Sequence, residues 1–401
     1  MSLTKIIAAI FIVTSLFTSK SFTQNLNSIE GKVTDAKTGK PIEYATVFLS
    51  NTSIGVLTNK KGVYVIKNIP PGGYNLVCVI IGYGKVVQVV KITKGSDQKI
   101  DIVLDEKPIT AKEISVVGES PAEWQRRLKK FTKEFLGESS NADDSKIINP
   151  EIIDFEIDKN NNKLVASAQD AIVIVNHALG YKIKAYLKDF VWSLSEEYGG
   201  FQIDLLFEEL NSTDEKEKNN WQTNRLNVYK GSFRHFLKSC AEGNVYEEGF
   251  RLSKSHVTPE LTYLNNSIYL LSQNKNEMDL FLNSIIKKND EDIYCIVYDK
   301  LVQVVYLGAG EEPNYKVYME KLTGKGSLRI LSDINKYYAE TNSYQSSWII
   351  LSKGQLFFNS EGICSDDNPY GKKFAGYWAW KRVADLLPYD YKFSLLNESN
   401  N

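Results

Sequence analysis

Apolar and polar residues alternate in short stretches over the first quarter of the chain. Between residues 27 and 106, Gly and Pro turn signals separate these stretches, and in TNKKGVYVI Gly62 can take the positive φ angle of a hairpin turn. The segment EYATVFLS at 43–50 is apolar on both alternating faces, which predicts a strand covered on both sides. The regular spacing predicts an antiparallel β-sandwich of seven strands over 27–106.

A helical pattern begins at Ser120. Ser120 can cap the helix, Pro121 fits its first turn and Glu123 completes a capping box, while Gly137 can end it. Its apolar stripe has spacings of four, three and four and consists of Trp124, Leu128, Phe131 and Phe135. Five basic residues occupy much of the remaining surface: Arg126, Arg127, Lys129, Lys130 and Lys133. They can contact an anionic lipid or a partner, although a solvated helix surface explains the same pattern more simply.

Strand and helix patterns follow each other in the rest of the chain. Residues 213–243 are helical in composition, with a capping box at Ser212 and Glu215 and an interruption at Gly231. The segment GYWAWKRVADLLPYDY at 376–391 predicts an amphipathic helix that stops at Pro388. Strand patterns dominate elsewhere, with a polar turn at 158–163 and a hairpin turn at 359–362.

These patterns predict a β-rich α+β fold. A seven-stranded β-sandwich at 27–106 is followed by a linker at 107–120. A larger α+β domain with antiparallel sheets and a few helices then spans 121–393, and residues 394–401 form a tail.

The first 23 residues have the three-part pattern of a secretory signal peptide. Lys5 precedes the apolar run IIAAIFIVTSLF, which is too short to span a bilayer comfortably, and small residues follow it. We expect cleavage before Gln24, which removes Lys5 and Lys20 and changes the net charge from -1 to -1 - 2 = -3. The alternative is an N-terminal membrane anchor. No Cys follows the run, so a lipid-modified N-terminus is not expected.

Length and composition are those of a folded, near-neutral protein. With 401 residues, 43% hydrophobic and 24% charged, the chain is expected to form two or three domains. A net charge of -1 provides no field that would attract nucleic acid. The four cysteines are Cys78, Cys240, Cys295 and Cys364; export would allow disulfides, but Cys78 lies in the apolar run NLVCVII and is expected to be a buried apolar side chain.

The first domain resembles the carboxypeptidase regulatory-like family, whose fold is a transthyretin-like β-sandwich. The resemblance rests on GKVTDAKTGKPIEYATVFL, the hairpin TNKKGVYVI, PPGGY, and the pair Gly82 and Tyr83. Asn59 stands where the family usually has Asp before the hairpin Gly. The resemblance implies a non-catalytic domain, of a kind that in exported proteins of Gram-negative bacteria often precedes a TonB-dependent transporter or another envelope domain.

The second region is similar to an uncharacterised domain that follows this module in many exported proteins of such bacteria. The similarity rests on FTKEFLGESSNADDSKIINPEIIDFEID, LVASAQDAIVIVNHALGYKIKAYLKDF, GSFRHFL and GYWAWKRVADLLP, and spans most of residues 124–393. That group has no assigned catalytic residues, so the resemblance implies an architecture and no activity.

Residue types disfavour several kinds of enzyme. A zinc carboxypeptidase needs an H-x-x-E pair and a distant His, but none of His177, His235 and His256 has Glu three residues later. The sequence also lacks a G-x-S-x-G elbow and a G-x-x-x-x-G-K phosphate loop. His177 is expected to be a structural residue, and the pair Asp366 and Asp367 a polar turn. A glycosidase-like carboxylate pair stays open, because its spacing is spatial.

Six residues are candidates for contact with a partner. Arg225, Arg234 and His235 can form an anion site, although ordinary buried ion pairs explain them as well. Tyr377, Trp378 and Trp380 can stack on a sugar ring, although such a cluster is more often core or interface.

The sequence therefore predicts an exported, non-catalytic protein of a Gram-negative envelope, in the periplasm or associated with the outer membrane. We expect a protein or carbohydrate partner, no nucleic acid, no cofactor, no metal, no catalytic residues and no transmembrane span after signal cleavage. Two alternatives stay open: an envelope hydrolase with a carboxylate-based site in the C-terminal domain, and an accessory to a TonB-dependent outer-membrane transporter.

Overall fold

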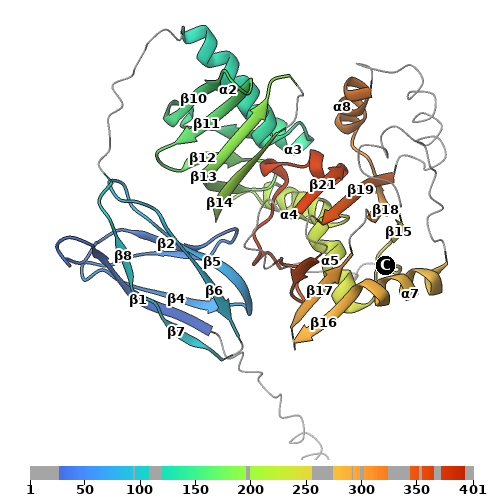
Figure 1. Ribbon diagram of the computed structural model, residues 1–401, viewed down its shortest axis with the longest axis horizontal. Coiled ribbons are helices and arrows are strands. Elements are labelled where there is room, and N and C mark those ends of the chain that lie inside the picture. Colours follow the sequence, from blue (N-terminus) through green and yellow to red (C-terminus); the bar gives the residue numbers. More distant parts are fainter. Residues whose placement is uncertain are drawn as a thin grey trace, which may run out of the picture.

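The computed structural model describes residues 27–93, 95–107, 120–195, 199–254, 274–290, 292–298, 302–323, 344–351, 355–364 and 372–392 (Figure 1). The predicted signal peptide, most of the predicted linker, the tail, and Asp366 and Asp367 lie outside these residues.

The N-terminal part is a β-sandwich. One sheet has the order β4-β1-β7, with β8 also paired to β1, and the other has the order β3-β2-β5-β6. Buried side chains such as Ile29, Val47 and Tyr64 fill the space between the sheets. The strands are β1 (Asn27–Asp35), β2 (Thr46–Leu49), β3 (Gly55–Leu57), β4 (Val63–Ile69), β5 (Gly72–Val79), β6 (Val86–Ile92), β7 (Asp97–Lys99) and β8 (Ile102–Leu104).

The described sandwich has eight strands rather than seven, because the last predicted strand is divided into β7 and β8. Both pair in parallel with successive parts of β1. Between them, the Ile100 carbonyl accepts a hydrogen bond from Tyr64 Oη (2.7 Å), and Asp101 Oδ1 accepts one from the Lys32 N–H (2.9 Å). A Cβ atom on Gly31 would lie only 1.7 Å from the Ile100 carbonyl oxygen, so this approach of two backbones requires glycine.

Local predictions for the sandwich are confirmed. Gly62 has a φ of 73°. The Asn59 side chain stabilises this turn by accepting hydrogen bonds from the N–H groups of Lys61 (2.9 Å) and Val63 (3.1 Å). Cys78 is buried in the core, where burial raises the pKa of its thiol to about 12. The strand predicted at 43–50 is shorter, since β2 comprises only Thr46–Leu49, and it is covered on both sides, because Val47 faces the core and Phe48 faces the second region.

A six-stranded sheet organises the second region. Its order is β10-β11-β13-β12-β9, with β14 paired to the other edge of β13. The long strand β13 pairs with β12 and β11 on one side and with β14 on the other. The strands are β9 (Ser145–Ile147), β10 (Ile153–Asp158), β11 (Lys163–Ala168), β12 (Ile172–Asn176), β13 (Tyr181–Ser193) and β14 (Gly199–Glu209).

Helix α2 (Pro121–Leu136) covers one face of this sheet. Its capping box of Ser120 and Glu123 is present, and Gly137 ends the helix, as predicted. Phe131 and Phe135 are fully buried against the sheet, with the Phe131 ring 4.8 Å from that of Phe190. The short helices α3 (Ser140–Asp143), η1 (Pro150–Ile152) and η2 (Val383–Asp385) lie around the same core.

The C-terminal half adds two smaller sheets, ordered β15-β18-β19-β21 and β16-β17-β20. Their apolar faces and the nearby helices share a core that includes Phe236, Phe250, Phe281 and Phe358. The elements are α4 (Glu215–Tyr229), α5 (Phe233–Glu242), β15 (Phe250–Lys254), α7 (Lys275–Ile285), β16 (Ile286–Asp290), β17 (Ile293–Val297), β18 (Val302–Gly310), α8 (Pro313–Thr323), β19 (Tyr344–Leu351), β20 (Gln355–Phe358), β21 (Lys372–Gly376) and α10 (Tyr377–Trp380).

Two helix predictions need correction. Helix α4 is capped by Asp214 rather than by Ser212, whose hydroxyl instead accepts a hydrogen bond from the Asp214 N–H (3.0 Å). The amphipathic helix predicted at 376–391 is reduced to the four residues of α10, because the backbone becomes extended at Lys381 (φ -66°, ψ 128°) before the short turn η2. The interruption at Gly231 and the turn at Gly362 are confirmed, with φ angles of 74° and 73°.

The sandwich docks on the edge of the larger sheet (Figure 1, blue against green). The loop after β2 extends that edge, since the Asn51 N–H donates to the Leu205 carbonyl (2.7 Å) and the Phe207 N–H donates to the Thr52 carbonyl (3.0 Å). There, Phe48 and Val77 of the outer face of the sandwich pack on Ala171, Tyr186 and Leu206 of the second region. The two parts are therefore joined by backbone pairing as well as by apolar contact.

Candidate functional site

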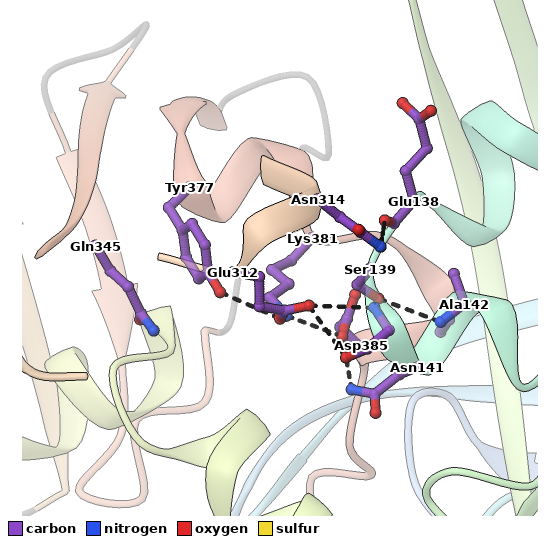
Figure 2. Close-up of polar contacts among 12 residues, drawn as sticks. Glu138, Ser139, Asn141, Ala142, Glu312, Asn314, Gln345, Tyr377, Lys381 and Asp385 are labelled. Carbon is purple, nitrogen blue, oxygen red and sulfur yellow. Dashed lines mark hydrogen bonds and ion pairs between the residues drawn. The ribbon is translucent and has the colours of Figure 1, made fainter. Parts of the chain in front are cut away.

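Three segments far apart in the sequence meet in one polar cluster, which we call the three-segment cluster (Figure 2). One segment lies at α3, the second immediately before α8, and the third runs from α10 to η2. The members are Ser139, Ser140, Asn141, Glu312, Tyr377, Lys381 and Asp385.

Local structure positions each side chain of the cluster. Ser139 caps α3 by accepting a hydrogen bond from the Ala142 N–H (3.2 Å). Glu312 immediately precedes Pro313, the first residue of α8, where the helix dipole favours a negative charge. Lys381 follows α10, and its extended backbone directs the chain into η2, which carries Asp385.

Glu312 is the centre of the hydrogen bonding. Its Oε2 atom accepts bonds from the N–H and the hydroxyl of Ser140, both at 3.1 Å. Its Oε1 atom accepts one from Tyr377 Oη (3.2 Å) and is paired with Lys381 Nζ. Lys381 is also 3.1 Å from Asp385 Oδ1, and Asp385 accepts a bond from Asn141 Nδ2 (2.9 Å). The ammonium group of Lys381 is therefore paired with two carboxylates, those of Glu312 and Asp385.

The ionisation of two adjacent glutamates is shifted in opposite directions. Burial disfavours the charged form of Glu312, but the charge and hydrogen bond of Lys381 and the bonds from Ser140 outweigh it and lower the pKa. For Glu311, burial raises the pKa to about 7 and Lys316 opposes this only in part. Among the described residues, Glu311 Oε2 has no hydrogen-bond partner. Burial and the charge of Glu312 also raise the pKa of Tyr377.

The cluster has the chemistry of a structural ion-pair network. The ammonium of Lys381 stabilises the ionised form of Glu312, so this carboxyl is a poor proton donor near neutral pH. Ser140 donates its hydroxyl to Glu312, whose lowered pKa makes this carboxylate a weak base. In the described part of the chain, no three His, Cys, Asp or Glu side chains are placed to hold a metal ion.

Beside the cluster, α2 and α8 form the walls of a groove of about 780 Å³, the α2–α8 groove. Helix α2 contributes two columns spaced by four residues: the exposed Gln125, Lys129 and Lys133, and the more buried Leu128, Thr132 and Leu136. The opposite wall consists of Asn314, Val317 and Tyr318 of α8, and one end contains Glu138, Ala142 and Asp143.

The cluster attaches the two walls of this groove to each other at one end. Asn314 Nδ2 donates to the Glu138 carbonyl (3.0 Å), and Glu312 binds Ser140, so the start of α8 is attached to the chain just after α2. Figure 2 shows the contact between Asn314 and Glu138 at the junction of these segments. Lys133 is paired with Glu138 (3.1 Å), whereas Lys129 and Asp143 have no charged partner among the described residues.

The three residues of the predicted anion site all use their side chains in contacts within the fold. Arg225 is buried on α4, where it binds the Leu179 carbonyl (2.7 Å) and Glu209 (2.7 Å) and lies 4.0 Å from the centre of the Tyr181 ring. Arg234 binds three backbone carbonyls instead, those of Glu361 (3.2 Å), Pro388 (3.1 Å) and Tyr391 (3.3 Å). Both guanidinium groups are thus used inside the fold.

His235 has two fixed partners. Its Nδ1 atom accepts a hydrogen bond from the Gly231 N–H (3.0 Å), so its Nε2 atom carries the proton and donates to Glu248 (3.0 Å). Burial lowers the pKa of His235, although Glu248 opposes this effect. The imidazole is therefore neutral near pH 7, and Glu248 accepts its N–H.

The predicted aromatic trio lies mostly inside the fold. Tyr377 and Trp380 are each 4% exposed and pack on Tyr315. Trp378 donates its indole N–H to the Gly231 carbonyl (2.7 Å). Partner binding by the six predicted residues stays a prediction, and internal contacts account for their positions.

Sequence reasoning did not identify Glu312, Lys381 or Asp385. A local signal existed for part of the cluster, because Ser139 precedes a short polar segment that a capping Ser can start, and Lys381 and Asp385 are spaced by four. No local signal connects Glu312 with either of them.

The described structure is a β-sandwich followed by a larger α+β region. Residues 29–116 match the family model of the CarboxypepD_reg-like domain, so this chain carries a carboxypeptidase regulatory-like domain at the sandwich. No curated protein matches the chain. None of the helices in the described residues has both the length and the apolar character needed to cross a membrane.

Three solved structures illustrate what the chain is similar to. A type II cohesin–X-dockerin complex of Acetivibrio cellulolyticus matches with 16% identity and a TM-score of 0.20, covering 26% of this chain and 72% of that one. The minor pilin GBS52 of Streptococcus agalactiae matches with 17% identity and a TM-score of 0.19. The match covers 21% of this chain and 45% of the pilin. The pilus 2b backbone protein of group B streptococcus matches with 16% identity and a TM-score of 0.18. The match covers 20% of this chain and 40% of the backbone protein. TM-scores this low identify neither a shared overall fold nor a function.

Proposed function

We propose that this protein is an exported, non-catalytic binding or structural protein of a Gram-negative envelope. The N-terminal pattern of a signal peptide and the CarboxypepD_reg-like domain support this proposal. The observation that carries it is the pairing of the carboxylates that folding brings together with a lysine. Glu312 and Asp385 share Lys381, so the polar residues of this cluster connect three segments of the chain.

The α2–α8 groove supports a binding role. Its volume of about 780 Å³ is within the range of ligand sites, and its lining combines aliphatic and polar side chains. Because its walls are attached to each other at Asn314 and Glu312, the groove is largely preformed, and a ligand would spend little free energy on ordering it.

Two measurements test the proposal. Fractionation of cells of the native organism should place the mature protein in the periplasm or with the outer membrane, and recovery in the cytoplasm would contradict export. The purified mature protein should show no activity in a panel of peptidase, esterase and glycosidase assays and no stoichiometric metal by elemental analysis. Hydrolysis abolished by a single Asp or Glu substitution would overturn the non-catalytic assignment.

A carboxylate-based hydrolase is the second candidate, and one specific observation favours it. Glu311 and Glu312 are adjacent, and their environments shift their pKa values apart, as in many acid–base pairs. Of these two glutamates only Glu311 has a raised pKa, and Glu311→Gln removes its carboxyl group. If the protein is a hydrolase that uses this pair, Glu311→Gln should abolish the activity, whereas Glu361→Gln on the surface should preserve it.

A further inference from the structure

We infer that the α2–α8 groove binds an extended peptide segment that carries an acidic and a basic side chain about four residues apart. This inference rests on the proposed binding function and names the class of its ligand. It depends on three properties of the groove: the position of its unpaired charges, the type of its apolar residues and its attachment to the three-segment cluster.

Opposite charges lie toward different ends of the groove. Lys129 is exposed on α2, and Asp143 is exposed at the end of α3, beyond the C-terminus of α2. From Lys129 to Gly137 the helix rises by about 12 Å. An extended peptide of four residues spans about 13 Å. The rise of α2 from Lys129 to its C-terminus, beyond which Asp143 lies, is therefore close to the separation of the acidic and basic side chains of such a peptide.

The apolar lining favours aliphatic side chains between these two charges. Leu128, Leu136, Ala142 and Val317 line the groove, and Val317 is 47% exposed. Burial of aliphatic groups against such residues is favourable, and it does not need the flat rings on which sugars usually stack. The lining contains one aromatic residue, Tyr318, which favours a peptide over an oligosaccharide.

Polar side chains between the walls can bind a peptide backbone. Asn314 uses its amide nitrogen for the Glu138 carbonyl and leaves its oxygen available to an N–H group. Gln125 and Thr132 lie along the same groove and offer both donors and acceptors. An extended backbone exposes such groups at regular intervals, whereas those of a helix are already paired.

The test uses a defined pool of fluorescein-labelled pentapeptides with Asp at the first position, Lys at the fifth, and Leu, Val, Ala or Tyr between them. Fluorescence polarisation of the mature full chain should show saturable binding below about 1 mM. A second pool with the charge order reversed should differ in affinity, because a peptide bound in one direction places only one charge order near Lys129 and Asp143, and equal affinity of the two pools would contradict the inference. A neutral pool with Asn and Gln at the ends should bind about tenfold more weakly than the better charged pool.

Charge substitutions then assign the binding to the groove. Lys129→Glu and Asp143→Lys should each weaken binding of the preferred pool about tenfold, and the double variant should prefer the pool of opposite charge order. Arg126→Glu is the matched control, because it makes the same change on an exposed residue of α2 outside the groove lining and should leave binding unchanged. All these positions are exposed, so the variants should keep their fold.

The outcomes separate this inference from the proposed function. Absence of peptide binding, or binding that Lys129→Glu and Arg126→Glu change equally, overturns the peptide assignment and leaves a non-catalytic role standing. Binding of chitotetraose in place of the peptides, dependent on Lys129, also overturns it. Cleavage of the bound peptides, detected by mass spectrometry, would contradict the non-catalytic proposal while supporting the groove as a peptide site.

Discussion

Phe48 of the β-sandwich stacks on Tyr186 of the larger sheet, with ring centroids 5.3 Å apart and planes inclined by 28°. Phe48 is fully buried, although it lies on the outer face of its own sheet. The regulatory-like domain is therefore packed as part of one structure with the second region. The first two predictions concern this interface.

Replacement of Phe48 should destabilise the whole chain. Phe48→Ala removes a buried ring and should lower the free energy of unfolding by about 3 to 5 kcal/mol, measured by urea denaturation. Val89→Ala is the control, because Val89 is 59% exposed on the same sheet, and its substitution should cost less than about 0.5 kcal/mol. Equal effects of the two substitutions would show that the interface contributes little.

A buried carboxylate provides the polar part of the same interface. Asp204 accepts a hydrogen bond from the Ser50 hydroxyl (2.9 Å) and pairs with Lys85 (3.2 Å) and Lys188 (2.9 Å). Asp204→Asn leaves both lysines without a counter-charge, and we expect a loss of about 2 kcal/mol, since the lysines can still reach water.

The matched control for Asp204 is Glu208→Gln on the same strand. Glu208 is 40% exposed and pairs with Lys184 (2.6 Å), so its neutralisation should cost less than about 1 kcal/mol. Thermal unfolding of the two variants in parallel checks this order. A loss for Glu208→Gln as large as that for Asp204→Asn would contradict the role assigned to Asp204.

The three-segment cluster should make stability depend on pH through Glu312. Its folded pKa is below the ordinary value of 4.5, so its contribution is present above pH 4.5 and is lost as the pH falls through the folded pKa. Lys381→Met removes the shared ammonium, and we expect a loss of about 3 kcal/mol at pH 7 and a smaller loss at pH 4.

Urea denaturation at both pH values measures this difference. Lys218→Met is the control, because the pair of Lys218 with Glu215 (2.7 Å) is exposed and should contribute less than about 1 kcal/mol at either pH. A loss for Lys381→Met that is equal at pH 4 and pH 7 would show that packing, rather than charge, explains its effect.

Glu311 should make stability depend on pH in the direction opposite to that of Glu312. Burial raises its folded pKa to about 7 from an ordinary 4.5, so the folded state is favoured below pH 4.5 and loses this contribution as the pH rises toward 7 and above. Glu311→Gln has no such titration, and at pH 8 it should be more stable than the unsubstituted protein by up to about 3 kcal/mol.

The difference between Glu311→Gln and the unsubstituted protein should therefore grow from pH 5 to pH 8 in denaturation experiments. Glu361→Gln, which changes an exposed carboxylate, should show no such trend. If Glu311→Gln is less stable at pH 8, the carboxylate must be bound rather than merely buried.

Short-range patterns were sufficient for much of the fold. The sandwich over 27–106, the capping box of α2, its end at Gly137 and the turn at Gly62 each depend on residues within a few positions of one another. The apolar character of both faces at 43–50 even indicated a covered outer surface. The length of the helix at 376–391 was wrong, because periodicity does not reveal that the chain must leave the helix at Lys381.

The sequence by itself determined where strands, caps and turns form, because these depend on neighbouring side chains and local backbone preferences. Only the tertiary structure decided which polar groups meet. Glu312 and Lys381 are 69 residues apart, and their contact depends on how β18, α8 and α10 are packed against α3. The same packing produces the α2–α8 groove. Phe48 and Asp204 are buried by a second long-range contact, that of the sandwich with the second region, since burial arises from neighbours that only the folded chain brings together.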